Sequence, residues 1–160
     1  MKKRVLLLLP LFLGACSDSG ESPVIKIEKL YAKIESDGEN TSSDEKDYAN
    51  QRDELPALKV GDEVKAFLLL DGNGAELKTF KLQNDDEVDT KLFYEKTEVS
   101  TEGNLRFKDG VSKAKIMVIA TIKQVDKNGD VKLEFYLSSK AECEGAQEEI
   151  GLKTKVEDEK

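Results

Sequence analysis

Apolar and polar residues alternate along most of the chain after residue 23, a pattern typical of strands that bury one face. The pattern is clearest in residues 113–124. One face of this segment carries Ala114, Ile116, Val118, Ala120 and Ile122, and the other face carries Met117, Ile119 and Thr121. Because the middle of the segment is apolar on both faces, we expect a central strand there.

Further strands are predicted at residues 24–35, 63–70, 76–82, 91–99, 104–108, 131–137 and 150–156. In the first of these, the apolar phase changes near Glu28 and Lys29, which predicts a β-bulge or a strand that crosses between sheets. Segments 71–74 and 126–130 hold Asn and Gly residues that accept a positive φ. We expect each of them to be the turn of a hairpin.

Seven or eight strands with regular turn signals and no long helical period predict an all-β domain built as a two-sheet sandwich. An eight-stranded barrel is the alternative. The segment Leu-Lys-Val-Gly-Asp-Glu-Val at residues 58–64 resembles the start of the second strand in immunoglobulin-like domains of bacterial envelope proteins. This resemblance implies an immunoglobulin-like sandwich.

One long acidic loop interrupts the strands, from Ser36 to Ala57, and it contains almost nothing apolar before Leu55. Loops above ~12–15 residues without their own structure are uncommon in compact domains, and they are either functional or disordered. A short helix over residues 43–52 would have only Tyr48 and Ala49 as its apolar face. We therefore suspect that residues 36–57 bind a partner.

The first residues have the pattern of a secretory signal, with a cationic start at residues 2–4 and an apolar stretch at 5–13. This stretch is too short for a membrane span, which needs ~20 residues. Leu13-Gly14-Ala15-Cys16 resembles the lipobox of bacterial lipoproteins, in which the signal peptidase cuts before a cysteine that carries lipid. The resemblance implies a signal peptide over 1–15, a lipidated Cys16 and a membrane partner. We expect a polar tether at 16–23, the β domain at 24–156 and a disordered tail at 157–160.

As a whole, the chain is similar to small lipoproteins of Bacteroidetes that join a lipobox to one immunoglobulin-like sandwich. In that group an acidic, serine-containing stretch after the lipidated cysteine directs the protein to the outer face of the outer membrane. Ser17-Asp18-Ser19-Gly20-Glu21 resembles such a signal. This similarity implies an outer-membrane lipoprotein, at the cell surface in preference to the periplasmic face. It implies no activity.

The amino-acid composition limits which partners the chain can bind and which reactions it can catalyse. The net charge of −8 argues against a nucleic-acid partner and against docking of the folded domain on anionic lipid. The chain has no histidine, so neither a Ser-His nor a Cys-His pair can activate a nucleophile. We expect a non-catalytic binding or accessory module without a cofactor, with a protein or glycan partner. A small hydrolase using two carboxylates and a structural envelope role are the alternatives.

Acidic clusters suggest calcium only weakly. Asp85, Asp86 and Glu87 are the weak candidates, because oxygen ligands from neighbouring loops bind this ion in extracellular modules. Segment 126–130 begins like an EF-hand loop but has Leu137 at the twelfth position, where the bidentate Glu belongs. Lipid on Cys16 would leave no second cysteine to join Cys143 in an intrachain disulfide, so we expect a fold without one.

Overall fold

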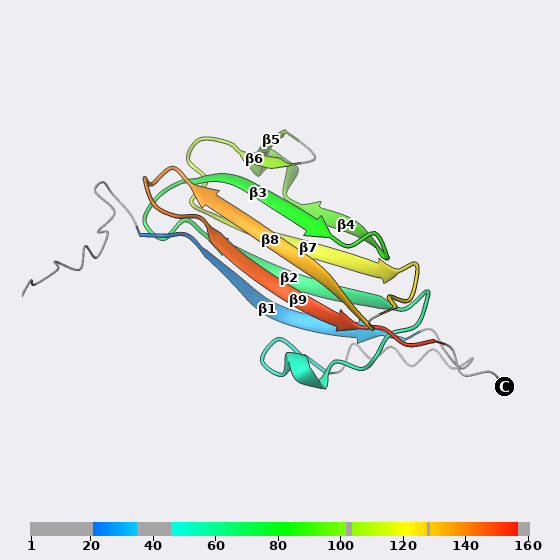
Figure 1. Ribbon diagram of the computed structural model, residues 1–160. Helices are drawn as coiled ribbons and strands as arrows, with labels where there is room; N and C mark the ends of the chain where they lie inside the picture. Colours follow the sequence, from blue (N-terminus) through cyan, green and yellow to red (C-terminus); the bar gives the residue numbers. More distant parts are fainter. Residues whose placement is uncertain (1–20, 35–45, 102–103, 128, 157–160) are drawn as a thin grey trace, which may run out of the picture.

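The computed structural model describes residues 21–34, 46–101, 104–127 and 129–156. These residues form nine strands in two antiparallel sheets that face each other as a β-sandwich (Figure 1). The four-stranded sheet has the order β1-β2-β7-β4, and the five-stranded sheet has the order β5-β6-β3-β8-β9. The strands are β1 (Val24–Lys33), β2 (Glu63–Asp71), β3 (Leu77–Asn84), β4 (Val88–Tyr94), β5 (Val99–Thr101), β6 (Leu105–Phe107), β7 (Lys113–Ile122), β8 (Asp130–Ser139) and β9 (Ala146–Lys153).

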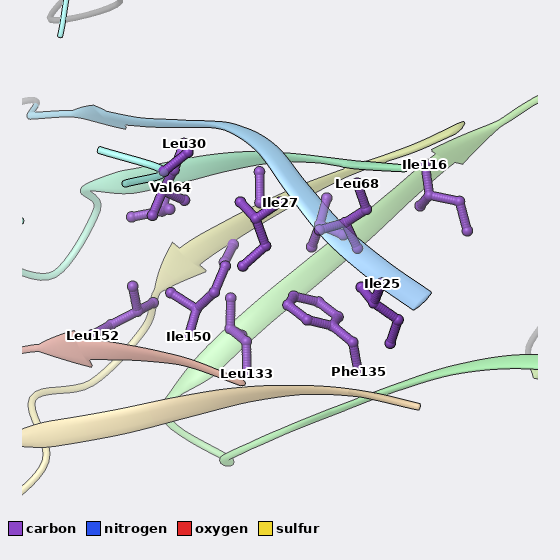
Figure 2. Close-up of a cluster of buried hydrophobic side chains, with 14 of the residues drawn as sticks. Ile25, Ile27, Leu30, Val64, Leu68, Ile116, Leu133, Phe135, Ile150 and Leu152 are labelled. Atoms are coloured by element: carbon purple, nitrogen blue, oxygen red, sulfur yellow. The ribbon is translucent and has the colours of Figure 1, made fainter. Parts of the chain in front are cut away.

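Alternating residues of both sheets meet in one core. The inward face of β7 is the predicted set from Ala114 to Ile122, and β7 lies between β2 and β4, so the prediction of a central strand is confirmed. Figure 2 shows side chains from β1, β2 and β7 pointing toward those of β8 and β9. Phe135 of β8 and Phe80 of β3 are fully buried, with ring centroids 6.2 Å apart.

The change of apolar phase in β1 is a β-bulge, as predicted. Ile27 pairs with Leu68 and Lys29 pairs with Phe67, so Glu28 is the extra residue. The bulge lets Ile27 and Leu30 both point into the core although they are an odd number of residues apart. One face of β1 is therefore buried on both sides of the bulge.

Both predicted hairpins are wrong. β2 lies in the four-stranded sheet and β3 in the five-stranded sheet, so residues 72–76 cross from one sheet to the other. Residues 123–129 carry the chain across in the same way between β7 and β8. The turn chemistry is nevertheless correct, since Asn73, Gly74 and Gly129 all have positive φ. Such residues allow a tight reversal, but whether the two strands pair is decided by which sheet buries each apolar face.

The sandwich is confirmed and the barrel is wrong, because the two sheets do not close on each other. Two strand predictions also differ from the structure, and one short strand was not predicted. The strand expected at 91–99 begins earlier and ends at Tyr94, where a short 3₁₀ turn (η2, Lys96–Glu98) follows. Short β5 was not predicted, and the last edge strand begins at Ala146. Within the described ranges, no helix is long and apolar enough to cross a bilayer.

Several sequence predictions fall outside the described residues. They are the signal peptide at 1–15, the lipidated Cys16 and the tail at 157–160. The end of the predicted tether is described, and it is attached to the domain. Glu21 donates its backbone N–H to the carbonyl of Asn73 at 3.1 Å, and Pro23 is buried.

Candidate functional site

The second half of the predicted loop, residues 46–58, lies along one side of the sandwich (Figure 1). It first contacts β1, an edge strand whose outer backbone groups need partners. Leu30 donates its N–H to Asp47 Oδ1 at 2.9 Å, and Tyr48 donates its N–H to the Leu30 carbonyl at 2.7 Å. Tyr48 and Ala49 are buried. This half of the segment thus covers the edge of the four-stranded sheet just beyond the bulge.

The same segment then reaches β9, the edge strand of the other sheet. Arg52 Nη1 lies 2.6 Å from Glu148 Oε1 and donates to the Glu149 carbonyl at 3.0 Å. Leu55 is buried, and Leu58 pairs in parallel with Thr154. Segment 46–58 therefore joins the two edge strands and closes this side of the sandwich.

The short, weak helix considered over residues 43–52 is not present in the described part of that range. Residues 46–50 are not helical, and a single 3₁₀ turn (η1) covers Arg52–Glu54. With only Tyr48 and Ala49 to bury, a helix would gain little, whereas the non-helical backbone at Tyr48 donates a hydrogen bond to the edge of β1. Residues 36–45 of the suspected partner-binding loop lie outside the described residues.

A groove of about 360 Å³ lies between segment 46–58 and the outer face of β8 and β9. Its floor is at Gly151, where a Cβ would have no atom within 4 Å. Residues lining it include Arg52, Leu55, Lys132, Glu149, Gly151 and Lys153. A glycine inside a strand often marks a place where another molecule approaches the backbone closely.

The groove has charges of both signs that already form pairs. Lys132 Nζ lies 3.1 Å from Glu149 Oε1, and the hydrogen bond to Glu149 raises the pKa of Lys132 above its ordinary value. Arg52 is held by Glu148 on the other side. Both cations are therefore paired with carboxylates of β9, which suits polar recognition of a ligand that carries both donors and acceptors.

The weak calcium candidates Asp85, Asp86 and Glu87 do not form one common site in the structure. Asp85 Oδ2 accepts the backbone N–H of Lys132 at 2.8 Å, so this carboxylate fastens the β3–β4 turn to β8. Asp86 is exposed, and Glu87 accepts the N–H of Lys123 through its backbone carbonyl. Among the described residues, no three side chains of Asp, Glu, Cys or His are grouped to hold a metal ion.

The two glycine-containing turns also have structural partners. Asp71 Oδ1 accepts the N–H of Asn73 at 2.9 Å, and the hydrogen bond from Lys113 lowers the pKa of Asp71. In segment 126–130, Asp126 donates its N–H to Thr154 Oγ1 at 3.1 Å. Asn128 lies outside the described residues.

Cys143 lies in the connection between β8 and β9, and it is disulfide-bonded in the structure. The expectation of a fold without a disulfide is therefore wrong for this structure. The chain contains one other cysteine, Cys16, which lies outside the described residues. A cysteine sulfur that carries a lipid thioether cannot also form a disulfide.

The sequence pointed to the loop but not to the groove beside it. Nothing in the sequence pattern singles out Arg52, Lys132 or Glu149 as a site. The available signal was Gly151, which interrupts a strand pattern between Ile150 and Leu152 without any turn.

Comparison with known proteins supplies a family. Residues 16–154 match the DUF5035 family, described as a domain of unknown function. No curated protein matches the chain.

Proposed function

The chain belongs to the DUF5035 family, and from this premise we propose that it is a lipid-anchored, non-catalytic binding module of the bacterial cell envelope. It is displayed from the outer membrane, at the cell surface in preference to the periplasmic face. Its binding site is the groove between segment 46–58 and strand β9.

Two features of the N-terminal region support the anchor. Leu13-Gly14-Ala15-Cys16 has the residues of a lipobox. The family match begins at Cys16, the residue that would become the N-terminus after cleavage. Together they favour Cys16 as the site of lipid attachment.

The strand order supports an immunoglobulin-like domain. Constant-type immunoglobulin sheets have the orders A-B-E-D and C-F-G. The order β1-β2-β7-β4 corresponds to the first of these, and β3-β8-β9 corresponds to the second. The short strands β5 and β6 then form an added hairpin beside β3. Domains of this topology commonly act as binding modules, with activity residing in loops and edges.

The observation that carries the binding site is the fixation of segment 46–58. Asp47 holds one end to β1, and Arg52 holds the middle to β9. A long connection that is ordered against both sheets presents a preorganised surface, which lowers the entropic cost of binding. The groove at Gly151 is the concave part of that surface.

The anchor is tested by intact-mass and peptide analysis of protein isolated from its native envelope. We expect cleavage before Cys16 and a diacylglyceryl thioether on its sulfur. The Cys16→Ala variant should remain uncleaved and should carry no diacylglyceryl group. A disulfide between Cys16 and Cys143 in the native protein would contradict the anchor.

The groove is tested by filling it. Gly151→Tyr places a ring over the floor, and the open space above Gly151 means that the fold should be retained. After crosslinking on intact cells, the wild-type protein should capture a stoichiometric protein or glycan, and Gly151→Tyr should lose it. Lys78→Tyr, at an exposed position on β3 outside the groove, is the matched control and should retain it. Equal capture by both variants would exclude the groove.

A further inference from the structure

The outer face of the four-stranded sheet is apolar in its middle although no other layer covers it among the described residues. We call it the aromatic face, defined by the outward side chains Tyr31, Phe67, Leu69, Phe93, Met117 and Ile119. Lys29, Phe67, Met117 and Phe93 form one row across all four strands. Phe93 is 46% exposed, and Phe67 meets Tyr31 edge to face at 6.1 Å. A groove of about 590 Å³ runs along this row.

The outer face of the five-stranded sheet is different. Its outward positions on β3, β8 and β9 are almost all polar, with Tyr136 as the aromatic exception. These positions are Thr79, Lys81, Gln83, Asp130, Lys132, Glu134, Tyr136, Ser138, Gln147, Glu149, Gly151 and Lys153. The outward apolar side chains of the strands therefore concentrate on one of the two sheets, as they do where a surface has a partner.

Charge on the aromatic face also departs from that of the whole chain, whose net charge is −8. Lysines outnumber carboxylates at the outward positions of its strands. The lysines are Lys26, Lys29, Lys33, Lys65, Lys91, Lys113 and Lys115, and the carboxylates are Glu28, Glu63, Asp71 and Asp89.

Several of these lysines remain available for an external anion. Lys113 pairs with Asp71 at 2.9 Å, and Lys115 pairs with Glu28 at 3.4 Å. In the part of the chain that the structure describes, other lysines have no carboxylate oxygen within 4.0 Å of their Nζ atom. They are Lys26, Lys29, Lys65 and Lys91. Apolar rings surrounded by unpaired lysines are the composition of surfaces that lie in a membrane interface, where the lysines reach anionic headgroups.

The N-terminal attachment places this face near the anchor. Asn73 holds Glu21 and Ser22 at the start of β1, which is itself a strand of the four-stranded sheet. Five Cα–Cα steps separate Cys16 from Glu21, and at ~3.6 Å each they reach at most ~18 Å. Val24, the first residue of β1, is 47% exposed and points outward on the same face. Lipid on Cys16 would therefore hold the edge of the aromatic face close to the bilayer.

We propose that the aromatic face lies on the bilayer surface, with Phe93, Phe67 and Met117 among the headgroups and the unpaired lysines on anionic lipid. This orientation rests on the lipid anchor of the proposed function. It turns the five-stranded sheet and the groove at Gly151 away from the membrane. The net charge of −8 argues against docking of the folded domain on anionic lipid, but the face that meets the lipid in this proposal has an excess of lysines over carboxylates.

The absence of tryptophan from the chain allows a direct test. The lipidated full-length mature protein carrying Phe93→Trp, or Tyr136→Trp as the matched control on the other sheet, is reconstituted in phosphatidylethanolamine–phosphatidylglycerol vesicles. Lipids with a nitroxide near the headgroup quench an indole that enters the interface. Because an interfacial apolar face sits about 5–10 Å into this region, Phe93→Trp should lose roughly half of its emission or more. Tyr136→Trp should change little.

A third variant tests the charges. Lys29→Glu with Lys91→Glu in the Phe93→Trp background should weaken quenching, and so should neutral phosphatidylcholine vesicles. Equal quenching at both indole positions, or none at position 93, would overturn the proposal. An indole at position 93 that responds instead to a soluble anionic glycan or an envelope protein would assign the face to that partner and also overturn it. The intact mass distinguishes failure of the lipid anchor from failure of this orientation. Protein without lipid on Cys16 would overturn both the anchor and the orientation. Lipidated protein without quenching would overturn the orientation alone.

Discussion

The carboxylate of Asp47 accepts the backbone N–H of Leu30 at 2.9 Å, two residues after the extra residue of the β1 bulge. The same Oδ1 accepts the N–H of Ala49 at 2.9 Å. One side chain therefore satisfies the edge of a strand and fixes the turn that covers it. An acidic residue of the predicted loop therefore connects two parts of the fold.

Asp47→Ala should destabilise the domain, because the N–H groups of Leu30 and Ala49 both lose their acceptor. The loss in free energy of unfolding should be about 1–3 kcal/mol, as for partly buried donors left without a partner. Urea denaturation measures it. Asp47→Asn keeps an acceptor oxygen and should lose less, and Asp53→Ala, an exposed neighbour, should be nearly neutral. If Asp47→Ala were as stable as Asp53→Ala, segment 46–58 would not be held in this way.

Arg52 and Glu148 should be energetically coupled across the side of the sandwich. Their side chains are 38% and 30% exposed, so a double-mutant cycle with Arg52→Met and Glu148→Gln should give about 0.2–1 kcal/mol. Arg52→Met should cost more than Glu148→Gln, because Arg52 also donates to the Glu149 carbonyl. Additive effects of the two substitutions would show that the ion pair contributes nothing to the closure of this side.

Strands and their buried faces could be predicted because period-2 alternation reports burial directly. The faces of β2, β7 and β8 were correct for that reason, and so was the phase change in β1. Strand pairing could not be predicted. A turn such as Asp71-Gly72-Asn73-Gly74 has the same local chemistry whether it joins two paired strands or crosses between sheets, and the choice depends on contacts far away in the sequence.

The candidate surfaces were harder to predict for a related reason. Segment 46–58 is ordered through single long-range bonds from Asp47 and Arg52, and such bonds leave no periodic trace. The aromatic face did leave a signal in the sequence. Four consecutive apolar residues, Phe67 to Leu70, exceed what a strand with one buried face needs, and the outer pair, Phe67 and Leu69, lies on that face. In β7, the apolar residues Met117 and Ile119 predicted only that this strand lies in the middle of a sheet.

Lys140 should make stability depend on pH at both ends of the range. Its hydrogen bonds lower the pKa of Glu76 and Asp109, and those bonds raise its own pKa. Each carboxyl then stabilises the fold above its unfolded pKa, and this contribution is lost as pH falls through the lower folded value. The lysine stabilises the fold below its unfolded pKa, and its contribution is lost as pH rises through the higher folded value.

Melting temperatures of the wild type and Lys140→Met should therefore differ most between about pH 5 and 9, given ordinary carboxyl and lysine pKa values. The difference should shrink toward both extremes and in high salt, since these groups are exposed. Lys78→Met, an exposed lysine on β3, is the control and should give no such profile. A difference that is constant with pH would mean that Lys140 acts through packing alone.

Two glycines should respond in opposite directions to the same substitution. At Gly72, a Cβ would lie 1.9 Å from the Ala75 carbonyl oxygen, in the connection that crosses between the sheets. Because that atom belongs to the backbone, Gly72→Ala must shift the crossing, and we expect a loss of at least about 2 kcal/mol. At Gly151 nothing lies within 4 Å, so Gly151→Ala should stabilise β9 by about 0.4–1 kcal/mol through the lower entropy of the unfolded chain. Urea titration of both variants checks the pair. A destabilising Gly151→Ala would show that the floor of the groove is not open, and it would remove the basis for filling it with Gly151→Tyr.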